Sequence, residues 1–285
     1  MSALDEKRIV LIAGQPKAGT TSLFDWLSQH PQIGAGKLKE LRFFLDPGYP
    51  LDAPLRFEGD NLAEYLTLFQ NAERPVLLDA SPDYIGCNAP LELPAIHPDS
   101  KAILLFREPV DRMMSAYRFY RSLGHVPAEM TFDAYIEKQH ADGVGPHTRS
   151  EFRALDHCRK GYHVARWRAA FGDNLLVLDF AQLRDAPEET LQEVCRFIEV
   201  DENAAIELSH ANKTRGNRAP GLFRIYAELR RSFAQATLAS PWVYRALQPL
   251  GRLVSRSFQS STSNSPAIEV SQRSLDIIRQ LEGAH

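Results

Sequence analysis

A glycine-containing turn near the N-terminus carries the residue types that bind phosphate. A continuous apolar run, residues 8–13, leads directly into this turn and then into a stretch with helical periodicity. The start of a helix leaves several backbone N–H groups unpaired and carries a positive partial charge, so it attracts anions. The sequence therefore predicts an anion site formed by Lys17, Ala18, Gly19, Thr20, Thr21 and Ser22.

The spacing within the turn distinguishes two kinds of phosphate chemistry. Gly14 and Gly19 are separated as in a Walker A loop, but that loop requires lysine directly after the second glycine. Thr20 occupies this position, and the lysine is Lys17, two residues before the glycine. A nucleoside-triphosphate enzyme uses the loop lysine together with Mg²⁺. The shifted position of the lysine favours a donor other than a nucleoside triphosphate. The alternative is a P-loop NTP-dependent kinase, in which residues 76–79 would be the Walker B strand.

A second group of phosphate-binding residues follows another apolar run. Residues 102–106 predict a buried strand, and Arg107 comes directly after it. Open α/β sheets bind ligands outside the carboxyl ends of their strands, which is where Arg107 would lie. Ser115 follows about two turns into the next predicted helix. Since a guanidinium binds phosphate with paired hydrogen bonds and a hydroxyl adds another, Arg107 and Ser115 predict a second phosphate contact.

Both segments resemble parts of a known enzyme family. Residues 16–22 (Pro-Lys-Ala-Gly-Thr-Thr-Ser) resemble the 5′-phosphosulfate loop of sulfotransferases that use 3′-phosphoadenosine 5′-phosphosulfate (PAPS), and 102–117 resemble the 3′-phosphate motif of that family. Residues 174–198 are similar to its strand-helix unit, and 210–218 to its late basic segment. The resemblance covers about residues 8–218 and implies that Lys213, Arg215 and Gly216 close over the 3′-phosphate.

The resemblance implies a PAPS-dependent sulfotransferase of the heparan-sulfate or bacterial single-domain type. Such an enzyme moves a sulfuryl group in line from PAPS to a hydroxyl, or an amine, of a carbohydrate or small-metabolite acceptor, with a carboxylate base and no metal. Lys17 would place positive charge on the sulfonate and the departing phosphate. A nucleotide-binding module with a degraded active site is the non-enzymatic alternative.

Three carboxylates compete for the role of the base. Residues 39–44 resemble the segment that carries the catalytic glutamate in heparan-sulfate-type and related bacterial enzymes, which makes Glu40 the candidate. The family often has histidine where this chain has Arg42. Asp79, at the end of a predicted strand, and Asp83 are the rivals. We expect a loop at the mouth of the site that supplies acceptor contacts from Ser81, Asp83 and Tyr84.

These residues need a parallel sheet to bring them together. Apolar runs at 8–13, 76–79, 101–106 and 174–179 alternate with helical patterns at 21–29, 61–70, 110–120, 153–171 and 187–198. The runs are almost continuously apolar, which is typical of strands buried on both faces. The sequence predicts a P-loop-like α/β fold with helices on both faces of a parallel sheet. We expect one domain over 1–285, with a core at about 8–218 and a helical C-terminal part at about 219–285.

Composition and charge exclude several function classes. The chain has 285 residues, 44% of them hydrophobic, and a net charge of −3, which argues against disorder and against nucleic-acid binding. The three cysteines have no Cys-x-x-Cys spacing, so we expect reduced, buried thiols rather than disulfides or zinc. No apolar run is long enough to span a bilayer, and no signal region precedes the first strand, so the expected location is the cytoplasm.

The C-terminal third has a different charge from the rest of the chain. Residues 211–260 contain nine lysines and arginines and the single acid Glu228. Apolar residues recur there at helical spacing, which predicts helices that complete the fold. Peripheral contact of these basic helices with a membrane is the alternative.

Overall fold

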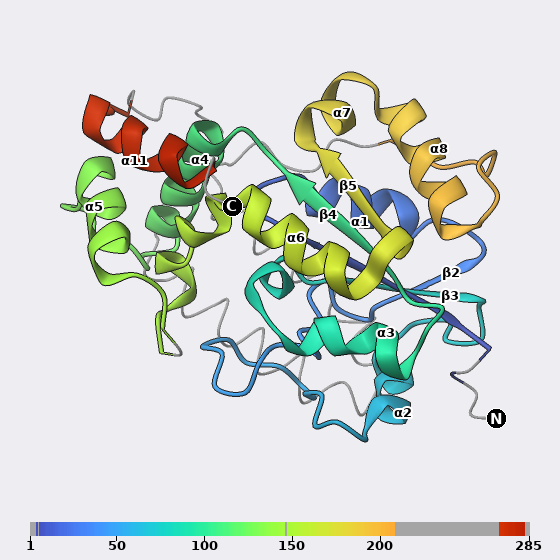
Figure 1. Cartoon of the computed structure of the whole chain (residues 1–285). Coiled ribbons are helices and arrows are strands. Elements are labelled where there is room, and N and C mark those ends of the chain that lie inside the picture. Colours follow the sequence, from blue (N-terminus) through green and yellow to red (C-terminus); the bar gives the residue numbers. More distant parts are fainter. Residues whose placement is uncertain (1–3, 5, 146, 209–267, 283–285) are drawn as a thin grey trace.

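Five parallel strands form the centre of the molecule. The computed structural model describes residues 4, 6–145, 147–208 and 268–282. The strands lie in the order β2-β3-β1-β4-β5 (Figure 1). Their bounds are β1 Arg8–Gly14, β2 Ile33–Ala35, β3 Val76–Ala80, β4 Lys101–Phe106 and β5 Leu175–Asp179. Every pairing is parallel, as the continuously apolar runs predicted.

Helices connect and cover these strands. The α-helices are α1 Thr20–Leu27, α2 Leu62–Tyr65, α3 Leu93–Ile96, α4 Pro109–Ser122, α5 Phe132–Asp142, α6 Lys160–Phe171, α7 Phe180–Asp185, α8 Pro187–Ile198 and α11 Gln272–Glu282. Short 3₁₀ helices are η1 Leu66–Leu68, η2 Pro82–Gly86, η3 Ala89–Glu92, η4 Ser150–Phe152, η5 Asp156–Cys158 and η6 Gly172–Asn174.

The two faces of the sheet bury separate apolar clusters. Successive side chains of a strand point to opposite faces. Leu11 of β1 belongs to the cluster that contains Trp167 of α6. Its neighbour Ile12 belongs to the other cluster, with Trp26 of α1 and Val194 of α8. Helices therefore cover both faces of the parallel sheet, which confirms the predicted fold class.

A third cluster joins the C-terminal helix α11 to the rest of the fold. Met113 of α4, Tyr135 of α5 and Ile278 of α11 pack together in it. The Asp133 carboxylate at the start of α5 accepts a hydrogen bond of 2.6 Å from the Ser274 hydroxyl of α11. The described part of the C-terminal extension is thus helical, as predicted. The basic stretch 211–260 lies outside the described residues.

Two predicted helices are shorter than the sequence pattern indicated. The pattern at 153–171 yields α6 only from Lys160, because Arg159 has ψ of 66°, which is outside the helical region. The pattern at 61–70 yields one turn of α-helix followed by a 3₁₀ turn. In both cases the apolar spacing was present, but the backbone departs from the α conformation.

The cysteines and the helix lengths agree with the compositional analysis. Cys87, Cys158 and Cys195 are buried and free, as expected. Within the described ranges no helix combines the length and the apolar character needed to cross a bilayer.

Candidate active site

The turn after β1 has the conformation of an anion site. Gly19 is the N-cap of α1, with a positive φ of 93°, and as a glycine it makes no side-chain capping hydrogen bond to the first helical turn. A Cβ atom at Gly19 would lie 2.8 Å from the Phe180 ring, so only glycine fits this position. Lys17 also has a positive φ, of 76°. Within the described part of the chain, the turn therefore presents helix N–H groups without an N-cap side chain next to Lys17, an arrangement that can bind phosphate.

The sheet places Arg107 beside this turn. β1 and β4 are neighbours and Gly14 pairs with Leu105, so the segments that follow both strands lie at the same carboxyl edge. The Arg107 backbone N–H donates to the Gln15 side-chain oxygen (2.9 Å), and its guanidinium lies 3.4 Å from the Lys17 carbonyl oxygen. The two phosphate-binding segments predicted from the sequence are thus brought together. The bridging role of Gln15, which is buried, had no sequence signal.

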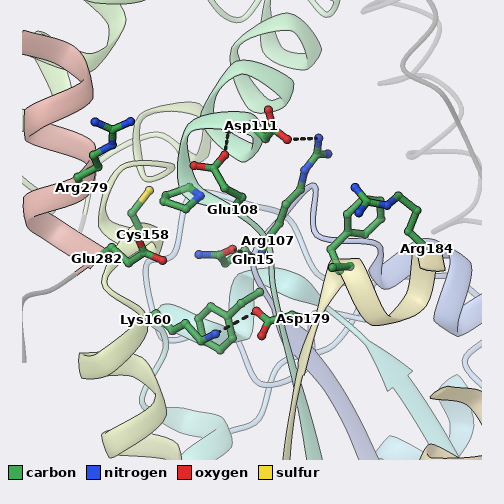
Figure 2. Close-up of a pocket in the computed structure, with 14 residues that line it drawn as sticks. Gln15, Arg107, Glu108, Asp111, Cys158, Lys160, Asp179, Arg184, Arg279 and Glu282 are labelled. Carbon is green, nitrogen blue, oxygen red and sulfur yellow. Dashed lines mark hydrogen bonds and ion pairs between the residues drawn. The ribbon is translucent and has the colours of Figure 1, made fainter. Parts of the chain in front are cut away.

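A pocket of about 600 Å³ adjoins Arg107 at the carboxyl ends of β4 and β5. Figure 2 shows the Arg107 guanidinium pointing towards Asp111 of α4, at 3.8 Å. Phe180 and Arg184 of α7 form one wall, and the guanidinium of Arg107 lies 4.9 Å from the centre of the Phe180 ring. Arg279 of α11 lies on the opposite wall (Figure 2). This is the position where open α/β sheets bind their ligands.

The Lys17 ammonium lies against α4. Its Nζ atom is 4.3 Å from the centre of the Phe119 ring, and Ser115 lies one helical turn before that ring. Burial, together with the positive charges of Arg107 and Lys39, lowers the pKa of Lys17 to about 8. Lys17 is therefore mostly protonated at neutral pH, but it loses its proton at a much lower pH than an ordinary lysine does. Phe119 was not among the residues predicted from the sequence, although its spacing of four residues from Ser115 indicates a shared helix face.

Glu40 is held between two cations in the segment after β2. Its carboxylate lies 3.1 Å from the Lys39 ammonium and 2.8 Å from the Arg42 guanidinium. Burial alone would raise the pKa of Glu40, but the charges and hydrogen bonds of Lys39 and Arg42 outweigh it and lower the pKa to about 2. Glu40 and Arg42 have positive φ values of 68° and 62°. Such backbone strain in residues other than glycine is concentrated at functional sites.

The rival carboxylate Asp79 is enclosed in the core. It has no exposed surface and accepts hydrogen bonds from three hydroxyls, those of Tyr65 (2.9 Å), Ser81 (2.8 Å) and Tyr84 (2.7 Å). Burial raises the pKa of Asp79, and the hydrogen bonds only partly offset this effect. Asp79 therefore organises its neighbours instead of facing a ligand. Ser81 and Tyr84 are buried with it, so this geometry gives no support to their predicted contact with an acceptor.

Asp83 is closer to the charged cluster but is also covered. Its side chain accepts a hydrogen bond of 2.8 Å from the Tyr49 hydroxyl. Burial and the negative charge of Glu40 raise its pKa, while Arg42 lowers it less strongly. Asp83 is buried, whereas 31% of the Glu40 side chain is accessible, so Glu40 is the more exposed of these two carboxylates.

Some sequence predictions lie outside what the structure describes. Lys213, Arg215 and Gly216 fall in 209–267, so their predicted contact with the 3′-phosphate is not placed. Among the residues with described positions, no group of three or more His, Cys, Asp or Glu side chains is arranged to hold a metal ion.

The fold and the site together define a P-loop-like α/β protein in which the two segments predicted to bind phosphate lie next to each other. A family model described as "Sulfotransferase domain" matches residues 7–235. The chain therefore belongs to the sulfotransferase family.

Individual relatives agree with this membership. Human bifunctional heparan sulfate N-deacetylase/N-sulfotransferase 3 is 30% identical over 202 residues, covering 67% of this chain and 22% of that protein. Mouse bifunctional heparan sulfate N-deacetylase/N-sulfotransferase 1 is 29% identical over 204 residues, with the same coverage of 67% and 22%. The chain thus spans about a fifth of the length of these relatives. The crystal structure of a sulfotransferase from Alicyclobacillus acidocaldarius has a TM-score of 0.59 at 25% identity, covering 72% of this chain and 85% of that one.

Proposed function

We propose that this protein transfers a sulfuryl group from PAPS to a hydroxyl or an amine of a carbohydrate or small-metabolite acceptor. One observation carries the proposal. Lys17 and the uncapped start of α1 lie directly beside Arg107, so a nucleotide with phosphates on both its 5′ and 3′ positions can contact both at once. Membership of the sulfotransferase family supports the same donor.

The residues present fit such a donor. The amides of Thr20, Thr21 and Ser22, with Lys17, would hold the 5′ side. Arg107 and Ser115 would hold the 3′-phosphate, and the Arg107 Nε atom is buried without a hydrogen-bond partner among the described residues. Lys213, Arg215 and Gly216 stay predicted contacts to this phosphate. The pocket beside Phe180 would receive the nucleoside.

The side chains of the site have separable roles in the proposed transfer. The donor supplies the activated sulfuryl group and a phosphate leaving group. Lys17 neutralises negative charge that develops between them, which is the kind of fixed electrostatic contribution that accelerates transfer. Glu40 takes the proton of the acceptor. A base works best when its pKa is near the working pH. The proposal therefore requires the acceptor to loosen at least one of the ion pairs that Glu40 makes with Lys39 and Arg42.

The names of the relatives bear on the class of acceptor. The names of the relatives include heparan sulfate N-sulfotransferase, which supports a carbohydrate sulfated on nitrogen. An acceptor screen should therefore pair each amino sugar with its hydroxyl counterpart. The cytoplasmic location and any membrane contact of 211–260 also stay predictions.

The kinase alternative is not favoured. Thr20 stands where a Walker A loop has its lysine, and the family match is to sulfotransferases. The two functions differ in their metal requirement, since phosphoryl transfer from ATP needs Mg²⁺.

Calorimetry tests the proposal without knowledge of the acceptor. Adenosine 3′,5′-bisphosphate is titrated in the absence of metal, in parallel with ATP in the presence of Mg²⁺. We expect tight binding of the bisphosphate alone. Binding of ATP alone would overturn the proposal in favour of a kinase. Radiolabelled PAPS with an acceptor panel then separates an active enzyme from a binding module, and the Lys17→Ala variant, which we expect to be inactive, controls for transfer at another site.

A further inference from the structure

Within the described part of the chain, the Lys17 ammonium contacts an aromatic ring and makes no ion pair with a carboxylate. Its Nζ atom lies 4.3 Å from the centre of the Phe119 ring, well within the range of a cation–π contact. Among the described residues, no Asp or Glu lies within ion-pair distance of this ammonium. Phe119 is half-buried on α4, so it offers a ring face that is partly shielded from water.

Helix α4 presents a row of site residues to Lys17. Asp111, Ser115 and Phe119 follow one another at intervals of four, which places them on one face of the helix. Arg107 directly precedes this helix and donates to the Lys17 carbonyl oxygen, while the ammonium of the same lysine reaches Phe119. The lysine side chain thus extends along the same helix face that carries Ser115.

The charges around Lys17 oppose its protonated form more than they favour it. Arg107, after β4, and Lys39, after β2, both repel the ammonium, and Glu40 is the one carboxylate whose charge favours it. Glu40 is itself engaged by Lys39 and Arg42. The negative face of the Phe119 ring therefore adds attraction at a position where the surrounding charges give the ammonium little net support.

We propose that Phe119 is a positioning residue that holds the Lys17 ammonium charged and in place beside the phosphate turn until the donor binds. The effect of Phe119 on catalysis rests on the proposed function, whereas the contact between Phe119 and Lys17 does not. When the donor binds, its negative charges replace the ring as the partner of the ammonium. Phe119 itself need not touch the reacting atoms.

The proposal predicts a shift in the titration of Lys17. Replacing Phe119 by Leu or Met keeps an apolar side chain of similar volume but removes the ring face. The pKa of Lys17, about 8 in the native protein, should fall by about 0.5 to 1 unit, the shift expected for losing a partly desolvated cation–π contact. Phe119→Trp retains a ring and should leave the pKa close to the native value.

Nuclear magnetic resonance measures this pKa in the donor-free protein. The protein is labelled with ¹³C at the lysine ε-carbons, and the Lys17 signal is identified by its absence in Lys17→Arg. Phe197→Leu is the matched control, because it removes a comparable ring, 5.1 Å from the Lys101 ammonium, at the opposite edge of the sheet. Circular dichroism verifies that each variant is folded, and the Leu and Met substitutions serve as independent replacements if one of them does not fold.

Single-turnover transfer at PAPS well below saturation supplies the catalytic readout, because this rate reports the donor-free enzyme, in which the ring is still the partner of the ammonium. We expect Phe119→Leu and Phe119→Met to lower this rate about 2- to 5-fold at pH 8, with nearly complete recovery at pH 6.5 as Lys17 regains its proton. A pKa of Lys17 unchanged to within about 0.2 units in both variants would overturn the proposal. If the native protein transfers no sulfuryl group, the proposed function fails, while the NMR titration still decides whether Phe119 holds Lys17.

Discussion

Arg107 gives the sharpest test of how the nucleotide is bound. Arg107→Ala should weaken adenosine 3′,5′-bisphosphate far more than adenosine 5′-monophosphate, because the second ligand lacks the phosphate assigned to this side chain. The free protein loses little by the change. The contacts of the guanidinium with Asp111 (3.8 Å) and the Lys17 carbonyl (3.4 Å) are both long.

The size of the effect follows from the environment of the side chain. Hydrogen bonds to charged groups contribute about 1.5–3 kcal/mol, and a forked guanidinium–phosphate contact lies within or above this range. Arg107 has 24% of its side chain exposed, so solvent screens the contact and the lower part of the range applies. About 1.5–2 kcal/mol corresponds to an affinity loss of roughly 10- to 30-fold for the bisphosphate. The monophosphate should lose less than about threefold.

Calorimetric titration of both ligands against both proteins provides the measurement. Arg184→Ala is the matched control, since this arginine lines the same pocket but its guanidinium is engaged by Asp185. We expect the control to affect both ligands equally and weakly. An equal loss for the two ligands with Arg107→Ala would falsify the assignment of Arg107 to the 3′-phosphate.

Four further expectations concern turnover, stability and pH. Glu40→Gln should reduce turnover by about 10²-fold or more while bisphosphate affinity stays intact, and near-normal initial rates would move the base role to another carboxylate. Gly19→Ala should abolish bisphosphate binding, because its Cβ would lie 2.8 Å from the Phe180 ring on a backbone with φ of 93°, and unaltered calorimetric binding would contradict this account of the turn. Asp79→Ala leaves three buried hydroxyls without their acceptor and should lower the free energy of unfolding by about 3 kcal/mol or more, whereas an unchanged urea midpoint would show that this cluster is not structural. The value of kcat/KM for the donor should fall above pH 8 as Lys17 loses its proton, and a profile level to pH 10 would mean that its charge is not required.

The sequence was most informative where structure is local. The strands β1, β3 and β4 were predicted because both of their faces are buried, which produces continuous apolar runs, and β5 was predicted from its apolar run although Leu176 and Val177 are only half-buried. β2, at Ile33–Ala35, is only three residues long and has no periodicity to detect. The pattern at 153–171 overextended a helix, because apolar spacing does not report the backbone conformation of Arg159.

The site residues also differ in whether local sequence or tertiary structure brings them together. Lys17, Gly19 and the start of α1 are contiguous in the chain, so the residue types and spacing by themselves predicted the turn and its proposed anion binding. That Arg107 lies beside this turn required β4 to be the neighbour of β1, which the order of strands in the sheet decided.

Only the tertiary structure revealed which polar groups are already engaged. In the sequence, Asp79 and Asp83 were rivals of the candidate base Glu40, but packing encloses Asp79 among three hydroxyls. Packing likewise places the Phe119 ring against Lys17 across 102 positions of sequence. The physical reason is that spacing along a chain determines local backbone geometry and helix faces. Burial, partners and pKa values depend on segments that meet only when the sheet and its helices assemble.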